Sequence, residues 1–392
     1  MDYQNLFNTT VLEMRPSGIR KYFDLLDGME DVITLGVGQP DFPVPEVVRM
    51  AQLSAMEDGH VPYTANAGTM ELRESISGYL SRRFDLHYAP EHELLVTVGG
   101  SEAIDLTLRA VLNPGDEVIV PEPTFVCYGP LARLCGGVVV PLVTTAKEGF
   151  KLTPEALRAA ITPRTKVLVL PFPTNPTGAI MTRDELSAIA EVLEDTDILV
   201  LSDEVYAELT YTGHHVSPAS LPAMRDRTVV IGSASKNLAM TGARLGYAAA
   251  PAPIIAAMTR IHQYGIMSAP TVAQIAAAKA FASCDADIER MRLSYDRRRC
   301  LMLGGFASME LPCREPQGAF YLFPDISASG LTSEEFCDRL LTEGRVAVIP
   351  GTAFGDSGEG YIRICYAYAE EKLYEALRRI AIFWRKVTGL AA

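Results

Sequence analysis

The sequence has no excess of positive charge and no long apolar run. Its 392 residues include 35 Lys and Arg against 48 Asp and Glu, which gives a formal net charge of −13. Binding to nucleic acid or to an anionic membrane surface needs clustered cations, so this balance argues against both kinds of partner. No apolar stretch is long enough to span a bilayer. The N-terminus carries acidic residues and no continuous apolar segment, so we do not expect it to be a signal peptide.

The sequence also lacks the spacings typical of disulfide frameworks and metal sites. Its seven cysteines include no CxxC pair, and its six histidines are dispersed apart from the adjacent His214 and His215. An odd, unpatterned set of cysteines in a large chain favours reduced thiols and a cytoplasmic location. We expect no metal site, because neighbours in sequence do not automatically face one ion. Internal repeats and low-complexity tracts are absent as well.

What is present is an ordinary globular composition in a long chain. Hydrophobic residues make up 48% of the sequence and charged residues 21%. Single cores stop growing at about 250–300 residues, so a chain of this length predicts two lobes.

Short apolar runs alternate with helical patterns in the middle of the chain. Continuous Val, Ile and Leu runs are typical of strands buried on both faces, as in a parallel sheet that helices cover. The strand-like runs are residues 93–98, 117–123, 137–142, 166–171, 197–203 and 228–233, and the helical patterns include residues 102–112 and 183–195. This alternation predicts an α/β domain.

The two ends of the chain differ from this middle part. Residues 11–45 contain a short helical pattern, one strand-like piece and a Pro-rich extended segment. A long charged helix is predicted from residue 285, followed by strand-like pieces at 318–326, 345–351 and 361–367 and a terminal amphipathic helix. We therefore expect a large domain over residues 46–285, and a smaller α+β domain formed by residues 1–45 and 286–392.

Polar residues directly follow several of the predicted strands. Ligands of open α/β sheets bind beyond the carboxyl ends of the strands, so these residues should converge on one site. Ser101 and Glu102 open a helix after two glycines, a pattern that suits a phosphate and equally suits a capped helix without a ligand. Asn175 precedes a proline, and is either part of a rigid turn or an amide donor at the edge of the sheet.

Asp203 ends a buried strand, where a carboxylate is costly unless it meets a cation or several donors. Its alternative role is to cap a helix that begins after it, because the segment EVYAEL follows. Tyr206 would then project from the first turn of that helix, beside Asp203.

Lys236 follows the last of these strands, with Ser233 and Ser235 before it and Arg244 after it. A lone lysine here is most simply a solvated loop residue. Among cations and apolar groups, however, a lysine has a lowered pKa and becomes an amine nucleophile. One ligand, pyridoxal 5′-phosphate (PLP), needs all of these groups together. Its aldehyde takes a lysine, its phosphate takes serine and arginine, and its pyridine nitrogen takes an acid such as Asp203.

Ordered motifs along nearly the whole chain resemble those of fold-type-I PLP-dependent aminotransferases of class I/II, and especially the aspartate and aromatic aminotransferase-like members of bacteria and archaea. The motifs include GVGQPDFPVP (36–45), VTVGGSEAI (96–104), NPTG (175–178), SDEVY (202–206) and SASKNLAMTGARLGY (233–247). The resemblance implies a large domain with a mostly parallel seven-stranded sheet between helices, and a smaller α+β domain.

The resemblance also implies roles for residues around the cofactor. Lys236 is expected to bond to the aldehyde and to move the proton, and Asp203 to pair with the pyridine nitrogen. Tyr206 and Asn175 are expected to hydrogen-bond the ring hydroxyl, and Phe125 to stack on the ring. The groups expected to hold the phosphate are Ser101, the backbone N–H of Glu102, Ser233, Ser235 and Arg244.

The same resemblance implies how the substrate binds and how many chains are needed. Gly38, Asn175 and Arg363 are expected to hold the substrate α-carboxylate, with Arg363 as the main contact because its planar fork matches a carboxylate. Tyr63 is expected to reach the phosphate of the neighbouring subunit's cofactor, so a homodimer with shared active sites is implied.

Three departures from the family pattern bear on the substrate. Ala243 stands where many relatives carry an aromatic residue, and Phe125 replaces the Tyr or Trp often found at the stacking position. Ser101 stands where some aspartate-specific relatives carry a lysine that meets a side-chain carboxylate. Ser101 thus disfavours aspartate. The segment PTFVCYGP (123–130) resembles archaeal aromatic aminotransferases, and SEAID (101–105) with RLCGG (133–137) resembles bacterial members with broad or uncertain substrates. The resemblance therefore favours transfer of an amino group from an aromatic amino acid, or from a broad range of L-amino acids, to a 2-oxo acid such as 2-oxoglutarate by a ping-pong mechanism.

Other functions on the same scaffold remain alternatives at this stage. The residues above would equally serve an aspartate-type or diaminopimelate-related aminotransferase, or a C–S β-lyase. A cofactor-binding regulator without catalysis is disfavoured, because such regulators carry a DNA-binding domain before this scaffold and the resemblance here begins near residue 11.

Overall fold

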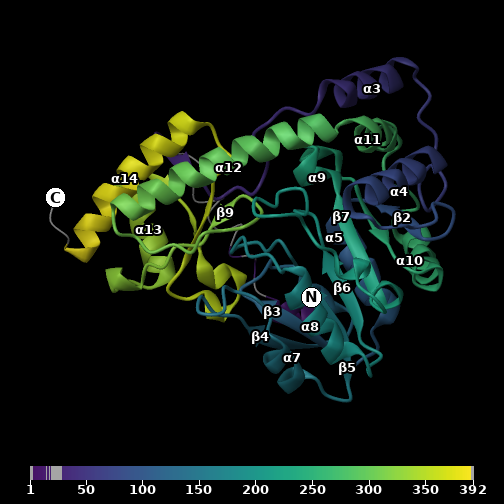
Figure 1. Ribbon diagram of the computed structural model, residues 1–392, viewed down its shortest axis with the longest axis horizontal. Helices are drawn as coiled ribbons and strands as arrows, with labels where there is room; N and C mark the ends of the chain where they lie inside the picture. Colours follow the sequence, from purple (N-terminus) through teal and green to yellow (C-terminus); the bar gives the residue numbers. More distant parts are fainter. Residues whose placement is uncertain (1–2, 15, 17, 19–28, 390–392) are drawn as a thin grey trace.

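A seven-stranded sheet organises the larger part of the molecule (Figure 1). In this computed structural model, which describes residues 3–14, 16, 18 and 29–389, the strand order is β2-β8-β7-β6-β5-β3-β4. The strands are β2 (Leu94–Thr97), β3 (Glu117–Glu122), β4 (Val138–Val143), β5 (Thr165–Leu170), β6 (Leu199–Asp203), β7 (Thr228–Ser233) and β8 (Gly246–Ala249). Strand β8 is antiparallel to both of its neighbours, and the pairs from β7 to β4 are all parallel. The mostly parallel seven-stranded sheet is therefore confirmed.

The apolar runs of the sequence predict six of these strands and miss β8. Its residues, GYAA, include glycine and alanine, which have low β propensity. Pairing on both sides compensates for this, because Tyr247 lies opposite Val96 of β2 and opposite Gly232 of β7. Gly232 leaves room for the Tyr247 ring, since a Cβ at that position would lie 2.2 Å from it. Tertiary pairing, rather than local propensity, forms this strand.

Helices cover both faces of the sheet, as alternate residues of β7 show. Val229 and Ile231 share an apolar cluster with α5 (Gly100–Val111), α6 (Tyr128–Leu134) and α10 (Ala252–Gly265). Val230, between them, belongs to a cluster on the other face with α4 (Met70–Phe84) and α11 (Thr271–Ser283), and α3 (Glu46–Glu57) packs on α11. The helices α7 (Pro154–Ala160) and α8 (Arg183–Leu193) contribute to a third cluster, which includes residues of β5 and β6. Burial on both faces explains the continuous apolar strands.

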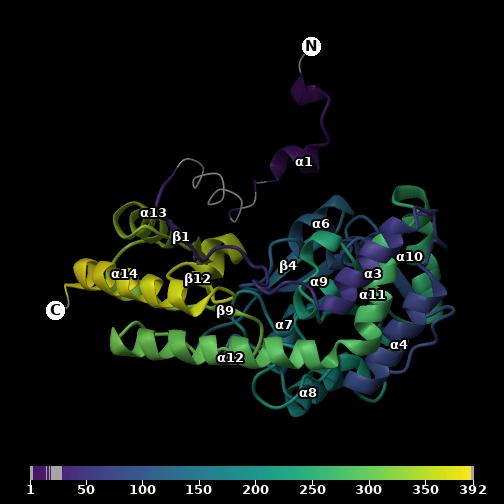
Figure 2. The same cartoon turned by 90° about the horizontal axis from the view of Figure 1, so that it is seen from above.

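A second group of elements lies beside the sheet, around the long helix α12 (Asp285–Ser308) (Figures 1 and 2). Its strands are β9 (Tyr321–Leu322), β11 (Ile349–Pro350) and β12 (Ile362–Cys365), which pair antiparallel, and β10 (Val346–Ala347). Its other helices are α13 (Ser333–Gly344) and α14 (Glu370–Thr388). Strand β1 (Ile33–Thr34) pairs in parallel with β10, so the N-terminal segment joins this group. The domain boundaries at residues 46 and 285 stay a prediction.

Short elements complete the chain. Helix α1 (Thr9–Glu13) lies at the edge of the molecule next to α6 (Figure 2), and the rest of the predicted N-terminal helical pattern falls largely outside the described residues. The four-residue helix α9 (Ala234–Asn237) follows β7 directly. The 3-10 helices are η1 (Tyr3–Asn5), η2 (Pro218–Ser220), η3 (Arg225–Arg227), η4 (Thr241–Ala243), η5 (Ser327–Ser329), η6 (Gly351–Phe354) and η7 (Asp356–Gly358).

Local sequence signals set several helix boundaries. Helix α8 begins with a capping box of Thr182 and Glu185, and α13 begins with one of Thr332 and Glu335. In each, the threonine hydroxyl and the glutamate carboxylate satisfy backbone N–H groups that the first turn leaves unpaired. All seven cysteine thiols are free of disulfides. Within the described part of the chain, no helix has both the length and the apolar character that crossing a membrane requires.

Candidate active site

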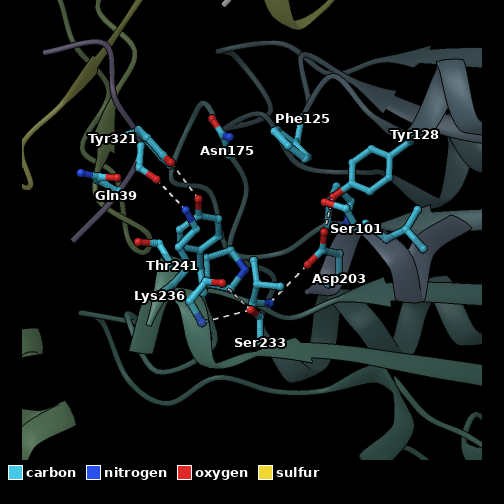
Figure 3. Close-up of a pocket in the computed structure, with 18 of the residues that line it drawn as sticks. Gln39, Ser101, Phe125, Tyr128, Asn175, Asp203, Ser233, Lys236, Thr241 and Tyr321 are labelled. Atoms are coloured by element: carbon cyan, nitrogen blue, oxygen red, sulfur yellow. Dashed lines mark hydrogen bonds between the residues drawn. The ribbon is translucent and has the colours of Figure 1, made fainter. Parts of the chain in front are cut away.

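A cavity of about 360 Å³ opens at the carboxyl ends of the sheet strands, where sequence analysis predicts the site (Figure 3). It is lined by all of the predicted site residues except Glu102 and Tyr63. The predicted residues in its wall are Gly38, Ser101, Phe125, Asn175, Asp203, Tyr206, Ser233, Ser235, Lys236, Arg244 and Arg363. The fold therefore brings residues from both ends of the chain to one place, as the convergence of strand ends predicts.

Lys236 occupies the short helix after β7 and faces this cavity. Ser233 caps that helix, because its Oγ accepts a 3.0 Å hydrogen bond from the backbone N–H of Ser235. The ammonium of Lys236 donates a 2.5 Å hydrogen bond to the carbonyl of Gly38. Burial lowers the pKa of Lys236 to about 8, and the nearby Arg363 also lowers it. An amine with this pKa is available as a nucleophile and proton carrier near neutral pH.

Asp203 ends β6 and points into the same cavity. Its Oδ2 accepts a 2.6 Å hydrogen bond from the hydroxyl of Tyr128, and its Oδ1 accepts one of 3.3 Å from the N–H of Val205. Burial raises the pKa of Asp203, while the bond from Tyr128 opposes this rise. No ion pair is formed by Asp203 within the described ranges. A buried carboxylate in this state suits a ligand that brings its own positive charge.

The predicted helix after Asp203 is wrong. Residues 204–208 form turns, and the Asp203 carboxylate closes a turn with Val205 instead of capping a helix. The backbone at the two ends of the expected helix pairs with distant segments, since the N–H of Glu204 donates to the carbonyl of Ile231 and the carbonyl of Leu209 accepts from the N–H of Ala319. These contacts compete with the hydrogen bonds that a helix would make. Tyr206 therefore reaches the cavity from a turn.

The start of α5 and the residue Arg244 form an anion-binding end of the cavity. Gly99 is the N-cap of α5, has a φ of 82° and provides no side-chain cap, so the alternative that Ser101 merely caps this helix does not hold. A Cβ on Gly99 would lie 2.6 Å from a guanidinium nitrogen of Arg244. Arg244 donates to the carbonyl of Thr241 and has no ion pair among the residues the structure describes. Free N–H groups, a helix dipole and an unpaired guanidinium together suit a phosphate.

Arg363, on β12, is a buried cation without an acidic partner. It is 2% exposed, and it donates a 3.0 Å hydrogen bond to Oδ1 of Asn175 and one of 2.5 Å to the carbonyl of Gly36. In the described part of the chain, its Nε has no hydrogen-bond partner and its guanidinium forms no ion pair. A buried charge left unpaired is strongly destabilising, so this geometry favours an anionic ligand with a carboxylate.

The remaining predicted residues take varied positions. Phe125 lies in the cavity wall and makes an edge contact with Tyr128, with 6.2 Å between ring centroids (Figure 3). Glu102 turns its carboxylate away from the cavity, where it bonds the N–H of Val98 and lies 2.7 Å from Nδ1 of His262. Its predicted contribution is through its backbone N–H, in the first turn of α5. Tyr63 is 84% exposed and lies outside this cavity, so its predicted role in a neighbouring subunit stays a prediction.

Sequence reasoning missed several residues of the cavity wall. The largest are Tyr128, which bonds Asp203, and Tyr321, whose hydroxyl lies 2.7 Å from that of Tyr206 (Figure 3). Gln39 and Thr241 also line the wall. The signal for Tyr128 was its position at the start of the helix that follows β3, shortly after Phe125. The signal for Tyr321 was its place in a predicted strand, although the sequence does not show which face of that strand meets the site.

The donor set of this cavity fits PLP. It combines an amine with a lowered pKa, a buried carboxylate, an uncapped helix start beside a free guanidinium, and an aromatic wall. Among the described residues, no group of three or more His, Cys, Asp or Glu is arranged to hold a metal ion.

Comparisons with known proteins agree with this geometry. The sequence profile of the family described as aminotransferase class I and II matches residues 30–380. The protein YugH of Bacillus subtilis (strain 168) is 51% identical over 378 residues, which are 96% of this chain and 98% of YugH. The aromatic-amino-acid aminotransferase 2 of Thermococcus litoralis is 41% identical, over 94% of this chain and 96% of that protein. The structure of aspartate aminotransferase from Thermus thermophilus with maleate has a TM-score of 0.91 at 39% identity, and the match covers 96% of this chain and 99% of that one.

Proposed function

The chain belongs to the class I and II aminotransferases, a family that uses PLP, and we propose that it transfers the amino group of aromatic and other uncharged L-amino acids. The acceptor is a 2-oxo acid that enters the same cavity, and the two half-reactions follow one another in a ping-pong mechanism. The observation that carries this proposal is Arg363, buried without an acid in the cavity that also contains Lys236 and Asp203.

Each group of the cavity has a role toward the cofactor in this proposal. Lys236 bonds to the aldehyde, Asp203 pairs with the pyridine nitrogen, and Phe125 stacks on the ring. Tyr206 and Asn175 hydrogen-bond the ring hydroxyl. The phosphate is held by Ser101, the backbone N–H of Glu102, Ser233, Ser235 and Arg244. When bound, PLP supplies a ring that accepts the electrons left at the substrate Cα after its proton departs.

The residues of the chain then bind, orient and move a proton. Arg363, with Gly38 and Asn175, holds the substrate α-carboxylate and so fixes the orientation of the Cα–H bond. Lys236 would take the proton from Cα as a general base and, as a general acid, deliver it to the carbon of the cofactor aldehyde instead of to Cα, a contribution of about 10²–10⁴-fold in rate. The Asp203 carboxylate keeps a proton on the nitrogen it faces.

The roles of the cationic side chains in the cavity favour a substrate whose side chain is uncharged. Lys236, Arg244 and Arg363 are the cationic side chains that line it within the described ranges, and each already has a role. Ser101, at the start of α5, also lines the cavity and adds no charge to it. A substrate such as aspartate would therefore place its second carboxylate in the cavity without a charged partner from this part of the chain. The names of the relatives do not decide the matter, because the aromatic and the aspartate enzyme are almost equally similar.

We also propose a cytoplasmic homodimer with shared active sites, and the domain division at residues 46–285. Two large side chains, Tyr63 and Tyr264, are 84% and 88% exposed. Their neighbouring segments are joined, since Asn66 bonds the carbonyl of Met267 and Thr271 bonds that of Pro62. The same two segments also expose Val61, Ile266 and Met267. A contiguous apolar surface is typical of a subunit interface. Sedimentation equilibrium of the purified protein tests the dimer, and a monomer at micromolar concentration would contradict it.

A half-reaction screen tests the substrate. The protein loaded with PLP is mixed with single L-amino acids, and the visible absorbance of the cofactor is followed. We expect tyrosine and phenylalanine to convert the cofactor to its stable amine form faster than aspartate does. A clear advantage for aspartate would contradict the proposed substrate class. Release of pyruvate and ammonia, without the amine form, would instead identify a β-lyase.

A further inference from the structure

Tyr321 contacts three parts of the active site, although sequence analysis assigns it no role. Its hydroxyl lies 2.7 Å from the hydroxyl of Tyr206. The guanidinium of Arg363 lies over its ring, 4.6 Å from the centroid. A Cβ on Gly38 would lie 2.2 Å from the hydroxyl oxygen of Tyr321, so any residue larger than glycine would displace that oxygen. Figure 3 shows Tyr321 across the cavity from Tyr128.

We propose that Tyr321 is a positioning residue that couples the cofactor side of the site to the substrate side. Its hydroxyl orients the hydroxyl of Tyr206, and its ring holds the guanidinium of Arg363. This inference rests on the proposed function, which gives Tyr206 the ring hydroxyl of PLP and Arg363 the substrate carboxylate.

The role of the Tyr321 hydroxyl follows from the single proton that each phenol can donate. Tyr206 and Tyr321 share one hydrogen bond, in which either oxygen can donate. A phenol has one proton, so Tyr206 can donate to the cofactor and keep its bond to Tyr321 only when Tyr321 is the donor between them. Both side chains are buried, 6% and 1% exposed, and water does not readily replace this donor. Tyr321 thereby directs the Tyr206 proton toward the cofactor and strengthens it as a donor.

The role of the Tyr321 ring follows from the environment of Arg363. This guanidinium has no acid beside it in the described part of the chain, and its fork makes only two hydrogen bonds, to Asn175 and Gly36. Two aromatic rings lie against it, those of Tyr321 at 4.6 Å and Phe354 at 4.8 Å. Attraction between a cation and a ring face is largest where water is excluded. The rings therefore hold the guanidinium in place before a carboxylate arrives.

The variant Tyr321→Phe separates the two roles, because it removes the hydroxyl and keeps the ring. We expect the pH titration of the visible absorbance of the PLP-loaded protein to shift to higher pH. A weaker donor leaves more negative charge on the ring oxygen of the cofactor, and this charge holds a neighbouring proton to a higher pH. Tyr206→Phe should shift the titration further in the same direction. Adding Tyr321→Phe to Tyr206→Phe should then produce no additional shift, because the effect passes through Tyr206.

The ring is tested with 3-phenylpropanoate, a carboxylate that has no amino group and cannot react. Its dissociation constant from the PLP-loaded protein should stay within about twofold for Tyr321→Phe and rise about 3- to 30-fold for Tyr321→Leu. Phe354→Leu is the matched control. It removes the other ring from Arg363 but does not contact Tyr206, so it should raise the dissociation constant and leave the absorbance titration unchanged. Thermal melting of each variant establishes that it is folded.

The outcomes separate this inference from the function on which it depends. A shift in Tyr206→Phe without one in Tyr321→Phe overturns the coupling and leaves the proposed function intact. Equal binding of 3-phenylpropanoate to Tyr321→Leu and to the unaltered protein overturns the role of the ring. If Tyr206→Phe itself does not change the titration, the assignment of Tyr206 to the cofactor is wrong, and the inference falls with it.

Discussion

The hydroxyl of Tyr128 donates a 2.6 Å hydrogen bond to Oδ2 of Asp203, and the two side chains are 1% and 6% exposed. Burial raises the pKa of Asp203, and this hydrogen bond opposes the rise. Tyr128 therefore helps to keep a carboxylate ionised in a place where ionisation is costly.

Replacing Tyr128 by phenylalanine should raise the pKa of Asp203 further. A hydrogen bond to a charged group contributes about 1.5–3 kcal/mol, which corresponds to roughly one to two pH units. The ionised form is lost as pH falls through the pKa, so the acidic limb of the pH profile of kcat/KM should move to higher pH. Tyr295→Phe is a suitable control, because the buried hydroxyl of Tyr295 has no partner among the described residues. If the acidic limbs of the unaltered protein, Tyr128→Phe and Tyr295→Phe coincide, the hydrogen bond from Tyr128 does not lower the pKa of Asp203.

Lys236 should destabilise the protein when no cofactor is bound. Burial lowers its pKa from 10.5 to about 8. Between these values the unfolded chain binds more protons than the folded one, so this group makes stability rise with pH. Lys236→Met should therefore stabilise the cofactor-free protein at pH 7, by about 1–3 kcal/mol, and the gain should shrink as pH approaches 10.5.

Urea unfolding of the cofactor-free proteins across this pH range measures the effect. Lys279→Met is the matched control, because Lys279 is exposed and pairs with Glu71 on the surface. A gain that does not depend on pH, or an equal gain in the control, would argue against the buried amine as the cause.

The substitution Gly99→Ala should weaken the binding of PLP. The new Cβ would lie 2.6 Å from the guanidinium of Arg244 and displace it from the start of α5. Gly115→Ala provides a control for backbone strain, since Gly115 has a φ of 91° against 82° for Gly99 but nothing within 4 Å of its Cβ position. We expect the dissociation constant of PLP to rise at least about tenfold for Gly99→Ala, the loss of one or two charged hydrogen bonds, and to stay unchanged for Gly115→Ala.

Arg363→Lys should impair substrate binding although it keeps the charge. The ammonium of lysine cannot bond both Asn175 and Gly36 while it presents two parallel N–H groups to a carboxylate. We expect KM for the amino donor to rise roughly 10–100-fold, with PLP absorbance preserved. Arg378→Lys, at an exposed pair with Glu375, should leave KM unchanged. An unaltered KM in Arg363→Lys would show that the carboxylate binds elsewhere.

The sequence predicted the parts of the fold that depend on local pattern. Strands buried on both faces are visible as apolar runs, and the residues after them lie at one edge because parallel strands share a direction. Lys236 and Asp203 were found in this way, Arg244 was found by its place in the same segment as Lys236, and all three line the cavity. Strand β8 was missed because two neighbouring strands, rather than its own residues, form it.

Contacts between distant segments could not be predicted. Tyr128 and Asp203 are 75 positions apart, and Tyr206 and Tyr321 are 115 apart. The first pairing depends on how α6 packs on the sheet, and the second on how the second group of elements packs against it. The helix expected after Asp203 is absent for a similar reason, since the N–H of Glu204 and the carbonyl of Leu209 bond the distant residues Ile231 and Ala319.

The connection from β7 to β8 has a consequence for how this family of chains can vary. Lys236 and Arg244 both lie in it, and the pairing of Ser233 with Gly246 closes it at its base. In the proposed function, this segment sets the spacing between the amine that bonds the aldehyde and the guanidinium that holds the phosphate, two groups on adjacent ring positions of the coenzyme. Insertions and deletions should be rare here even where the side chains around them change freely.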